Sequence, residues 1–276
     1  MIAPRYRRLA GIGCAATLVL ILLVLAIPFL FRLSGQGDRI SVAARTTYTS
    51  GQYLAHVQPW AVTDMPVLRA WSNVSETMWI DPARFPGNVR FNWAWPPFSP
   101  RNGVGVWGYH HVAFGNADGG EPEAPVQPRQ VNAMTALSTR FAWTGDFRFG
   151  ESTVLTEFYL RSNPKDNESK LIEIGWLLHM SEATKRFLDD GQAYGTYTDP
   201  QGRQWRVVIF DTYLTFSAAN GDDVRKGEID MLHALHWLRG KGKITGKEWL
   251  TGLAIGAEPI KGFGNLELEQ WKVDFR

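Results

Sequence analysis

From residue 134 onward the chain consists largely of short runs in which apolar and polar residues alternate. Side chains of a β-strand point alternately to its two faces, so these runs predict strands with one buried face. Turn-forming residues (Gly, Pro, Asn and Asp) separate the runs. We expect strands at 134–143, 153–162, 171–180, 204–211, 249–258 and 265–275. The pattern predicts an all-β fold, an antiparallel β-sandwich.

One segment has a different period. Between residues 228 and 239, large apolar residues recur at spacings of three and four, at Ile229, Met231, Leu232, Leu235 and Leu238. Glycines flank this segment on both sides. We therefore expect a single short amphipathic helix in an otherwise β domain.

An uncharged stretch of 23 residues, Leu9–Phe31, lies near the amino terminus. As a helix it would be about 34 Å long, enough to cross the hydrocarbon core of a bilayer. Arg5, Arg7 and Arg8 precede it, and positive flanks stay on the cytoplasmic side, so the rest of the chain is expected outside the cytoplasm, periplasmic or extracellular. A cleaved signal peptide is the alternative, although its apolar region usually has only ~7–15 residues.

The chain is thus expected to have three parts. Residues 1–32 would form a basic cytoplasmic tail and a single transmembrane anchor, residues 33–50 a stalk, and residues 51–276 one folded domain. The sequence Ser34-Gly35-Gln36-Gly37-Asp38 at the start of the stalk is typical of a flexible linker.

Charge and cysteine content exclude several classes of protein. Four of the 29 Lys and Arg residues flank the apolar stretch, so 25 remain in residues 33–276 against all 27 acidic residues, which makes a nucleic-acid partner unexpected. The only cysteine, Cys14, lies inside the apolar stretch, which excludes an intramolecular disulfide and a cysteine nucleophile in the domain. His233 and His236 lack a third ligand nearby, so no metal site is predicted.

Three glutamates occupy unusual places in the predicted strands. In 171–178, Ile172, Ile174, Trp176 and Leu178 would face the core, which puts Glu173 beside Gly175 on the opposite face, where the missing side chain would leave the surface open. By the same alternation, Glu258 follows the small residues Ala254 and Gly256, and Glu157 shares a face with Tyr159. Each could simply be a solvated glutamate, and periodicity alone does not show that the three converge.

Residues from about 104 to 275 resemble glycoside hydrolase family 12, the endoglucanases built on a concanavalin-like β-jelly roll. Residues 171–177 resemble the nucleophile strand of that family, and residues 256–262 (Gly-Ala-Glu-Pro-Ile-Lys-Gly) resemble its acid/base segment. Residues 158–164 are similar to the end of its aspartate-containing strand with the Asn-Pro turn. The chain departs from the family in having Glu157 for the aspartate and Gly175 where many members carry Met.

The resemblance implies a retaining mechanism with Glu173 as nucleophile and Glu258 as acid and then base, without a cofactor. Glu157 would be the hydrogen-bond partner that keeps Glu173 oriented and ionised. An ionised Glu173 would raise the pKa of Glu258 and so keep it protonated. Trp79, Trp95 and Trp107 are candidates for stacking on sugar rings, with ordinary packing as the alternative for each. The resemblance also places His110, next to His111, near the cleft, again with a packing role as the alternative.

Together these observations predict a membrane-anchored, extracytoplasmic endo-β-1,4-glucanase acting on a β-linked polysaccharide. The alternative is a glycan-binding, lectin-like module on the same fold, with weak or no turnover. The presence of both glutamates favours the enzyme, because glycan binding alone would not require a pair of carboxyl groups.

Overall fold

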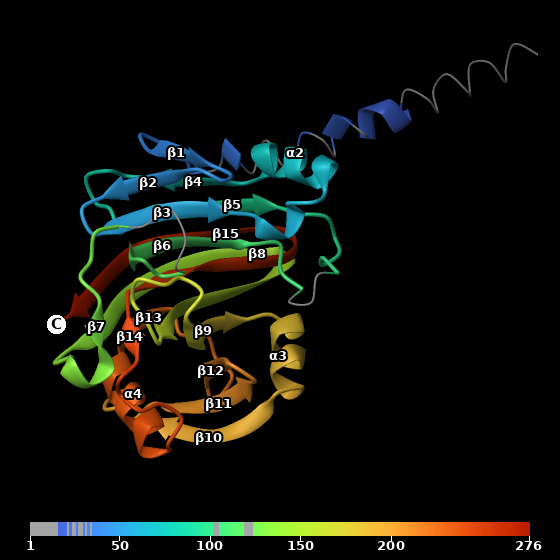
Figure 1. The fold of residues 1–276 in the computed structure, drawn as a ribbon. Coiled ribbons are helices and arrows are strands. Elements are labelled where there is room, and N and C mark those ends of the chain that lie inside the picture. Colours follow the sequence, from blue (N-terminus) through green and yellow to red (C-terminus); the bar gives the residue numbers. More distant parts are fainter. Residues whose placement is uncertain are drawn as a thin grey trace, which may run out of the picture.

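The computed structural model describes residues 16–20, 22–23, 26, 30, 32–33, 35–101, 105–118 and 124–276. Its strands (Figure 1) are β1 (Ile40–Ala43), β2 (Thr47–Ser50), β3 (Tyr53–Gln58), β4 (Thr77–Ile80), β5 (Val89–Ala94), β6 (Tyr109–Gly115), β7 (Arg129–Gln130), β8 (Leu137–Arg161), β9 (Lys170–Met180), β10 (Gln192–Thr198), β11 (Gln204–Phe210), β12 (Tyr213–Ala218), β13 (Lys226–Asp230), β14 (Trp249–Leu250) and β15 (Gly252–Phe275). Its α-helices are α2 (Pro66–Ser75), α3 (Glu182–Asp189) and α4 (Met231–Gly240), and its 3₁₀ helices are η1 (Trp60–Val62) and η2 (Val131–Ala133).

Two long strands, β8 and β15, pair with each other almost from end to end and belong to both layers of a sandwich. The carboxyl half of β15 and the amino half of β8 complete layer A, with the order β1-β4-β5-β15-β8-β13. The other halves complete layer B, with the order β2-β3-β6-β15-β8-β9-β12-β11-β10. One bulge in the β8–β15 pairing, between Pro259 and Lys261 and next to Gly262 at φ 69°, lies where β15 passes from its pairing with β6 to its pairing with β5. The predicted jelly-roll sandwich is confirmed.

Two observed strands, β8 and β15, are much longer than the predicted segments. Segments 134–143 and 153–162 belong to one strand, β8, and most of 249–258 and 265–275 belongs to β15. The residues between them were expected to be loops, but Gly150 pairs with Gly262 and Glu151 with Lys261, so each connection continues the ladder. The sandwich is antiparallel except for the β9–β12 pair, which is parallel.

The helix content was underestimated. The predicted helix at 228–239 begins only at Met231, because residues 226–230 form β13, and the Asp230 side chain caps it by accepting from the His233 N–H at 2.9 Å. The structure also contains α2 and α3, so the expectation of one short helix is wrong. α2 has ten residues and α3 has eight, and both are amphipathic, as α4 is.

The amino-terminal region also differs from the prediction. Residues 33–50 were expected to be a stalk, but β1 pairs with β4 and β2 with β3, so residues from 40 onward belong to the sandwich. The predicted transmembrane segment 9–31 lies mostly outside the described residues. Within the described part of the chain, no helix combines the length and hydropathy needed to span a bilayer.

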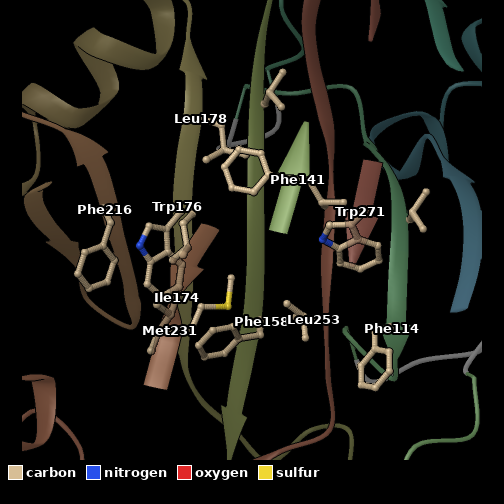
Figure 2. Packing of buried hydrophobic residues seen from close by; sticks show 14 of the residues in the cluster. Phe114, Phe141, Phe158, Ile174, Trp176, Leu178, Phe216, Met231, Leu253 and Trp271 are labelled. Atoms are coloured by element: carbon tan, nitrogen blue, oxygen red, sulfur yellow. The ribbon is translucent and has the colours of Figure 1, made fainter. Parts of the chain in front are cut away.

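The hydrophobic core fills the space between the two layers (Figure 2). Ile174, Trp176 and Leu178 of β9 point into it, as alternation predicted, and Trp176 stacks on Phe216 with ring centroids 4.6 Å apart. Leu253 and Ile255 of β15 and Phe158 of β8 are also fully buried there. These neighbours hold the three central strands of layer B in a fixed orientation, so the residues between them face the other side of the layer.

Candidate active site

Three adjacent strands in the middle of layer B each present one glutamate on the side away from the core. Glu258 is on β15, Glu157 on β8 and Glu173 on β9, and β8 lies between the other two strands. In the register, Glu157 is opposite Ala254 of β15 and Gly175 of β9, whereas Glu258 is opposite Thr153 and Glu173 is opposite Tyr159. The three glutamates therefore follow a diagonal across the sheet.

Two pockets meet at Glu173 and Glu258. The first, of about 380 Å³, is also lined by Gln58, Trp60, Tyr109, His111, Ala117, Asp118, Glu157, Tyr159 and Ala254. The second, of about 450 Å³, is also lined by Ser99, Gly105, Val106, Thr153, Leu177, Ala183, Thr184, Phe187, Phe210, Tyr213 and Ile260. Because both pockets include both glutamates, a ligand passing from one pocket into the other would cross the pair. We call the two pockets together the groove.

The two halves of the groove differ in polarity. Besides the shared glutamates, the first pocket contains acidic, histidine and amide side chains, whereas the polar side chains of the second are hydroxyls. Two hydroxyls in the second pocket, those of Thr153 and Thr184, are hydrogen-bonded to each other at 2.7 Å. Phe187 stacks on Phe210 at 4.2 Å, so aromatic rings form part of this wall.

The carboxyl groups of Glu157 and Glu173 lie close enough that each affects the pKa of the other. Burial and then the charge of Glu173 raise the pKa of Glu157 well above its usual value. Burial also raises the pKa of Glu173, but hydrogen bonds from Glu157 and Tyr159 and the charge of Lys170 act in the opposite direction. Glu173 therefore ionises first, and protonated Glu157 donates to it.

Glu258 is the second group that stays protonated. Burial, followed by the negative charge of Glu173, raises the pKa of Glu258 to about 8. Of the three glutamates in the groove, Glu173 is thus the one that ionises first, while the pKa values of Glu157 and Glu258 are raised further and favour their acid forms. Such a division of protonation states between neighbouring carboxyl groups is what acid and nucleophile roles require.

A chain of contacts supports Glu173 from the first pocket. The Tyr159 hydroxyl donates to the Glu173 carboxylate, and the Lys170 ammonium lies 4.0 Å from the centre of the Tyr159 ring. Lys170 in turn donates to Asp118 at 2.5 Å. This arrangement keeps a positive charge near Glu173 without placing it in direct contact.

His111 lines the first pocket as a neutral ring. Burial, together with the nearby His56, lowers the pKa of His111 to about 3. Its Nδ1–H donates to the Tyr109 carbonyl at 3.1 Å, which leaves Nε2 as a hydrogen-bond acceptor.

Of the predicted site residues, the structure brings Glu157, Glu173 and Glu258 together in one groove and places Trp79, Trp107 and His110 outside both pockets. His110 points from β6 to the core side, where its Nε2 lies 2.7 Å from Glu76 Oε1. The Trp79 indole N–H donates to the Arg32 carbonyl at 2.6 Å, and Trp107 is buried in a stack on Trp95 at 4.6 Å. Packing and internal hydrogen bonds account for these residues, so their predicted role at the substrate is not supported.

The groove contains residues that the sequence analysis missed. Tyr109 and His111 have the opposite parity from His110 on β6, and Trp60 lies in η1 just after β3. Tyr213 comes from β12, a strand that was not predicted. All seven residues of β6 are buried, so its sequence does not show which side chains face the groove and which face the core. That assignment requires the pairing of β6 with its neighbouring strands.

Glu173 lines both pockets, but the space over Gly175, which was expected to be open, is filled. Tyr213 reaches over this glycine from the neighbouring strand β12. Among the residues that the structure describes, no three His, Cys, Asp or Glu side chains are arranged to hold a metal ion.

Comparison with known proteins gives structural matches only. No protein-family model matches the chain, and no curated protein matches its sequence. Endoglucanase 3 of Trichoderma harzianum, from glycoside hydrolase family 12, is similar with a TM-score of 0.68 and 18% identity, covering 87% of this chain and 99% of that one. A family 12 xyloglucanase of Bacillus licheniformis matches with a TM-score of 0.68 and 14% identity, covering 86% of this chain and all of that one (100%).

The catalytic domain of Humicola grisea Cel12A, in complex with a thio cellotetraose, matches with a TM-score of 0.65 and 14% identity, covering 86% of this chain and 99% of that one. This chain therefore has the fold of the family 12 glycoside hydrolases over most of its length, as its sequence motifs predicted. At these identities the likeness concerns the fold.

Proposed function

We propose that this protein is a retaining endo-β-1,4-glucanase, a glycoside hydrolase that cleaves a β-glucan with two glutamates. The observation that carries the proposal is the meeting of two pockets at Glu173 and Glu258, with Glu173 the carboxyl group that ionises first and Glu258 raised to a pKa of about 8. The family 12 fold supports the same reading.

In this mechanism the ionised Glu173 attacks the anomeric carbon while Glu258 donates its proton to the departing glycosidic oxygen. The glycosyl–Glu173 bond is then broken by water, which gives up a proton to the now ionised Glu258. Protonated Glu157 and Tyr159 hold the Glu173 carboxylate by hydrogen bonds in the free enzyme. Two carboxyl groups about 5–5.5 Å apart on either side of the bond are what retention requires.

We propose further that the domain is tethered to a membrane outside the cytoplasm. The basis is the uncharged stretch 9–31 with its preceding arginines. Several leucines of this stretch are helical and more than half exposed, Leu18, Leu20, Leu22, Leu23 and Leu30. Fractionation of cells with protease treatment from the outer side tests the location, and a domain protected from protease in intact spheroplasts would contradict it.

The activity is tested by incubating the full-length protein with carboxymethylcellulose, mixed-linkage β-glucan and xyloglucan. We expect new reducing ends, with viscosity falling early because an endo-acting enzyme cuts within chains. Binding to any of these polymers without release of reducing ends would instead support the lectin-like alternative.

The hydrogen bond from Glu157 predicts a shift in pH dependence. Glu157→Ala removes a donor that lowers the pKa of Glu173, so the pKa of Glu173 rises and the acid limb of kcat/KM moves to higher pH. We expect a loss of about 10- to 100-fold near neutral pH. Glu157→Gln keeps an N–H donor and should retain most activity. An unchanged acid limb in Glu157→Ala, or equal losses in the two variants, would contradict the assigned role.

A further inference from the structure

Strand β9 lacks a side chain at the place where strand β12 supplies a phenol. Gly175 is opposite Thr215 in the parallel β9–β12 register, two residues beyond the Glu173–Tyr213 pair. Gly175 is not one of the glycines with positive φ, so its backbone would accept other residues. A Cβ atom built on Gly175 would lie 3.1 Å from the Tyr213 hydroxyl but 3.4 and 3.6 Å from its nearest ring carbons. The glycine therefore makes room for the hydroxyl, since the ring alone would be in ordinary contact.

The hydroxyl of Tyr213 differs from those of the other tyrosines in the groove. The Tyr109 hydroxyl donates to the Leu155 carbonyl at 3.4 Å, and the Tyr159 hydroxyl donates to Glu173. Among the described residues, no hydrogen bond engages the Tyr213 hydroxyl. Tyr213 lines the second pocket together with Glu173 and Glu258.

The surroundings keep this phenol protonated. Burial raises the pKa of Tyr213 well above its usual value, and the charges of Glu157 and Glu173 raise it further. At any pH at which the groove would work, Tyr213 thus offers a neutral O–H beside the two glutamates. A neutral O–H at this point complements an oxygen-rich ligand such as a sugar.

We infer that Tyr213 donates a hydrogen bond to an oxygen of the sugar bound between Glu173 and Glu258, and that Gly175 is required because any larger residue would displace the phenol hydroxyl. The inference rests on the proposed function and adds a substrate-binding residue to it. It explains why β9 has a glycine at position 175, beside the Tyr213 side chain of β12.

The test is a cycle of three variants in the full-length protein: Tyr213→Phe, Gly175→Ala and the two combined. With a cellulo-oligosaccharide as substrate, we expect Tyr213→Phe to lower kcat/KM by about 10- to 100-fold. Gly175→Ala should lower it about 3- to 10-fold in the wild-type background, because its new methyl group pushes the hydroxyl aside. In the Tyr213→Phe background the same change should cost less than about twofold, since only ordinary contacts with the ring remain.

Tyr194→Phe is the matched control, because Tyr194 packs against Trp237 outside the groove, and it should retain wild-type kinetics. The inference is overturned if Tyr213→Phe stays within twofold of wild type, or if Gly175→Ala changes kcat/KM by the same factor in both backgrounds. The latter result would show that Gly175→Ala acts on strand β9 itself and not through the Tyr213 hydroxyl.

Failure of the proposed function would be seen separately, as a wild type that releases no product. In that case the same cycle is measured as the affinity for cellotetraose by calorimetry. Weaker binding in Tyr213→Phe, with a smaller effect of Gly175→Ala in that background, supports the donor role without catalysis. A wild type that neither cleaves nor binds overturns both proposals.

Discussion

Replacing Glu173 by alanine should abolish glucan cleavage, with kcat falling about 10⁴-fold or more, because the first step then has no nucleophile. The fold should survive. Burial raises the pKa of Glu173, which means that the carboxylate is desolvated at a cost to stability, so the melting temperature should not fall. Activity is measured as reducing ends released from β-glucan, and folding by circular dichroism.

Azide distinguishes a missing nucleophile from a damaged site. In Glu173→Ala a small anion can enter the vacated space and attack the anomeric carbon of an activated aryl β-cellobioside, giving the α-glycosyl azide. Glu168→Ala is the matched control, because Glu168 is an exposed glutamate in the loop between β8 and β9. If Glu173→Ala retains wild-type cleavage, its assignment as nucleophile is wrong.

Replacing Glu258 by glutamine should have the second large effect, and it should depend on the leaving group. Cleavage of glucan, which needs a proton on the departing oxygen, should fall about 10²- to 10⁴-fold. With a 2,4-dinitrophenyl leaving group the first step needs no proton, so a burst of dinitrophenol should persist while the second step becomes slow. A uniform loss on both substrates would contradict an acid/base role.

The same variant tests the pH dependence. The pKa of Glu258 is raised to about 8, and the protonated form is the active one, so kcat/KM of the wild type should fall as pH rises through about 8. For the activated substrate this alkaline limb should be absent in Glu258→Gln. An alkaline limb that is unchanged in the variant would assign it to another group.

The sequence predicted the centre of layer B well because its strands have one face in the core and one in the groove. Alternation in β9 separates Ile174 and Trp176 from Glu173, and the structure keeps that division. The same argument placed Glu157 and Glu258 correctly. Alternation does not predict that the three glutamates lie close together, because residues 157, 173 and 258 meet only through pairing between strands that are distant in sequence.

For strands buried on both faces, the alternation of apolar and polar residues gives no signal, for a related physical reason. Every residue of β4 and of β6 is buried, so no polar face marks them as strands. His110 and His111 could not be assigned to a side without the register of β6, and His110 belongs with Glu76 in the core. The Tyr213–Gly175 contact joins two parallel strands and has no signal in either segment alone.

Covalent trapping tests most directly whether Glu173 acts as nucleophile across the groove from Glu258. A 2,4-dinitrophenyl 2-deoxy-2-fluoro-β-cellobioside should inactivate the wild-type protein with one sugar bound per chain. The fluorine slows both steps, whereas the activated leaving group speeds the first step alone, so the glycosyl-enzyme forms and then persists. Mass spectrometry of the digested protein should locate that sugar on Glu173. A label on Glu157 or Glu258, or unlabelled protein that still cleaves β-glucan, would contradict the two-glutamate account.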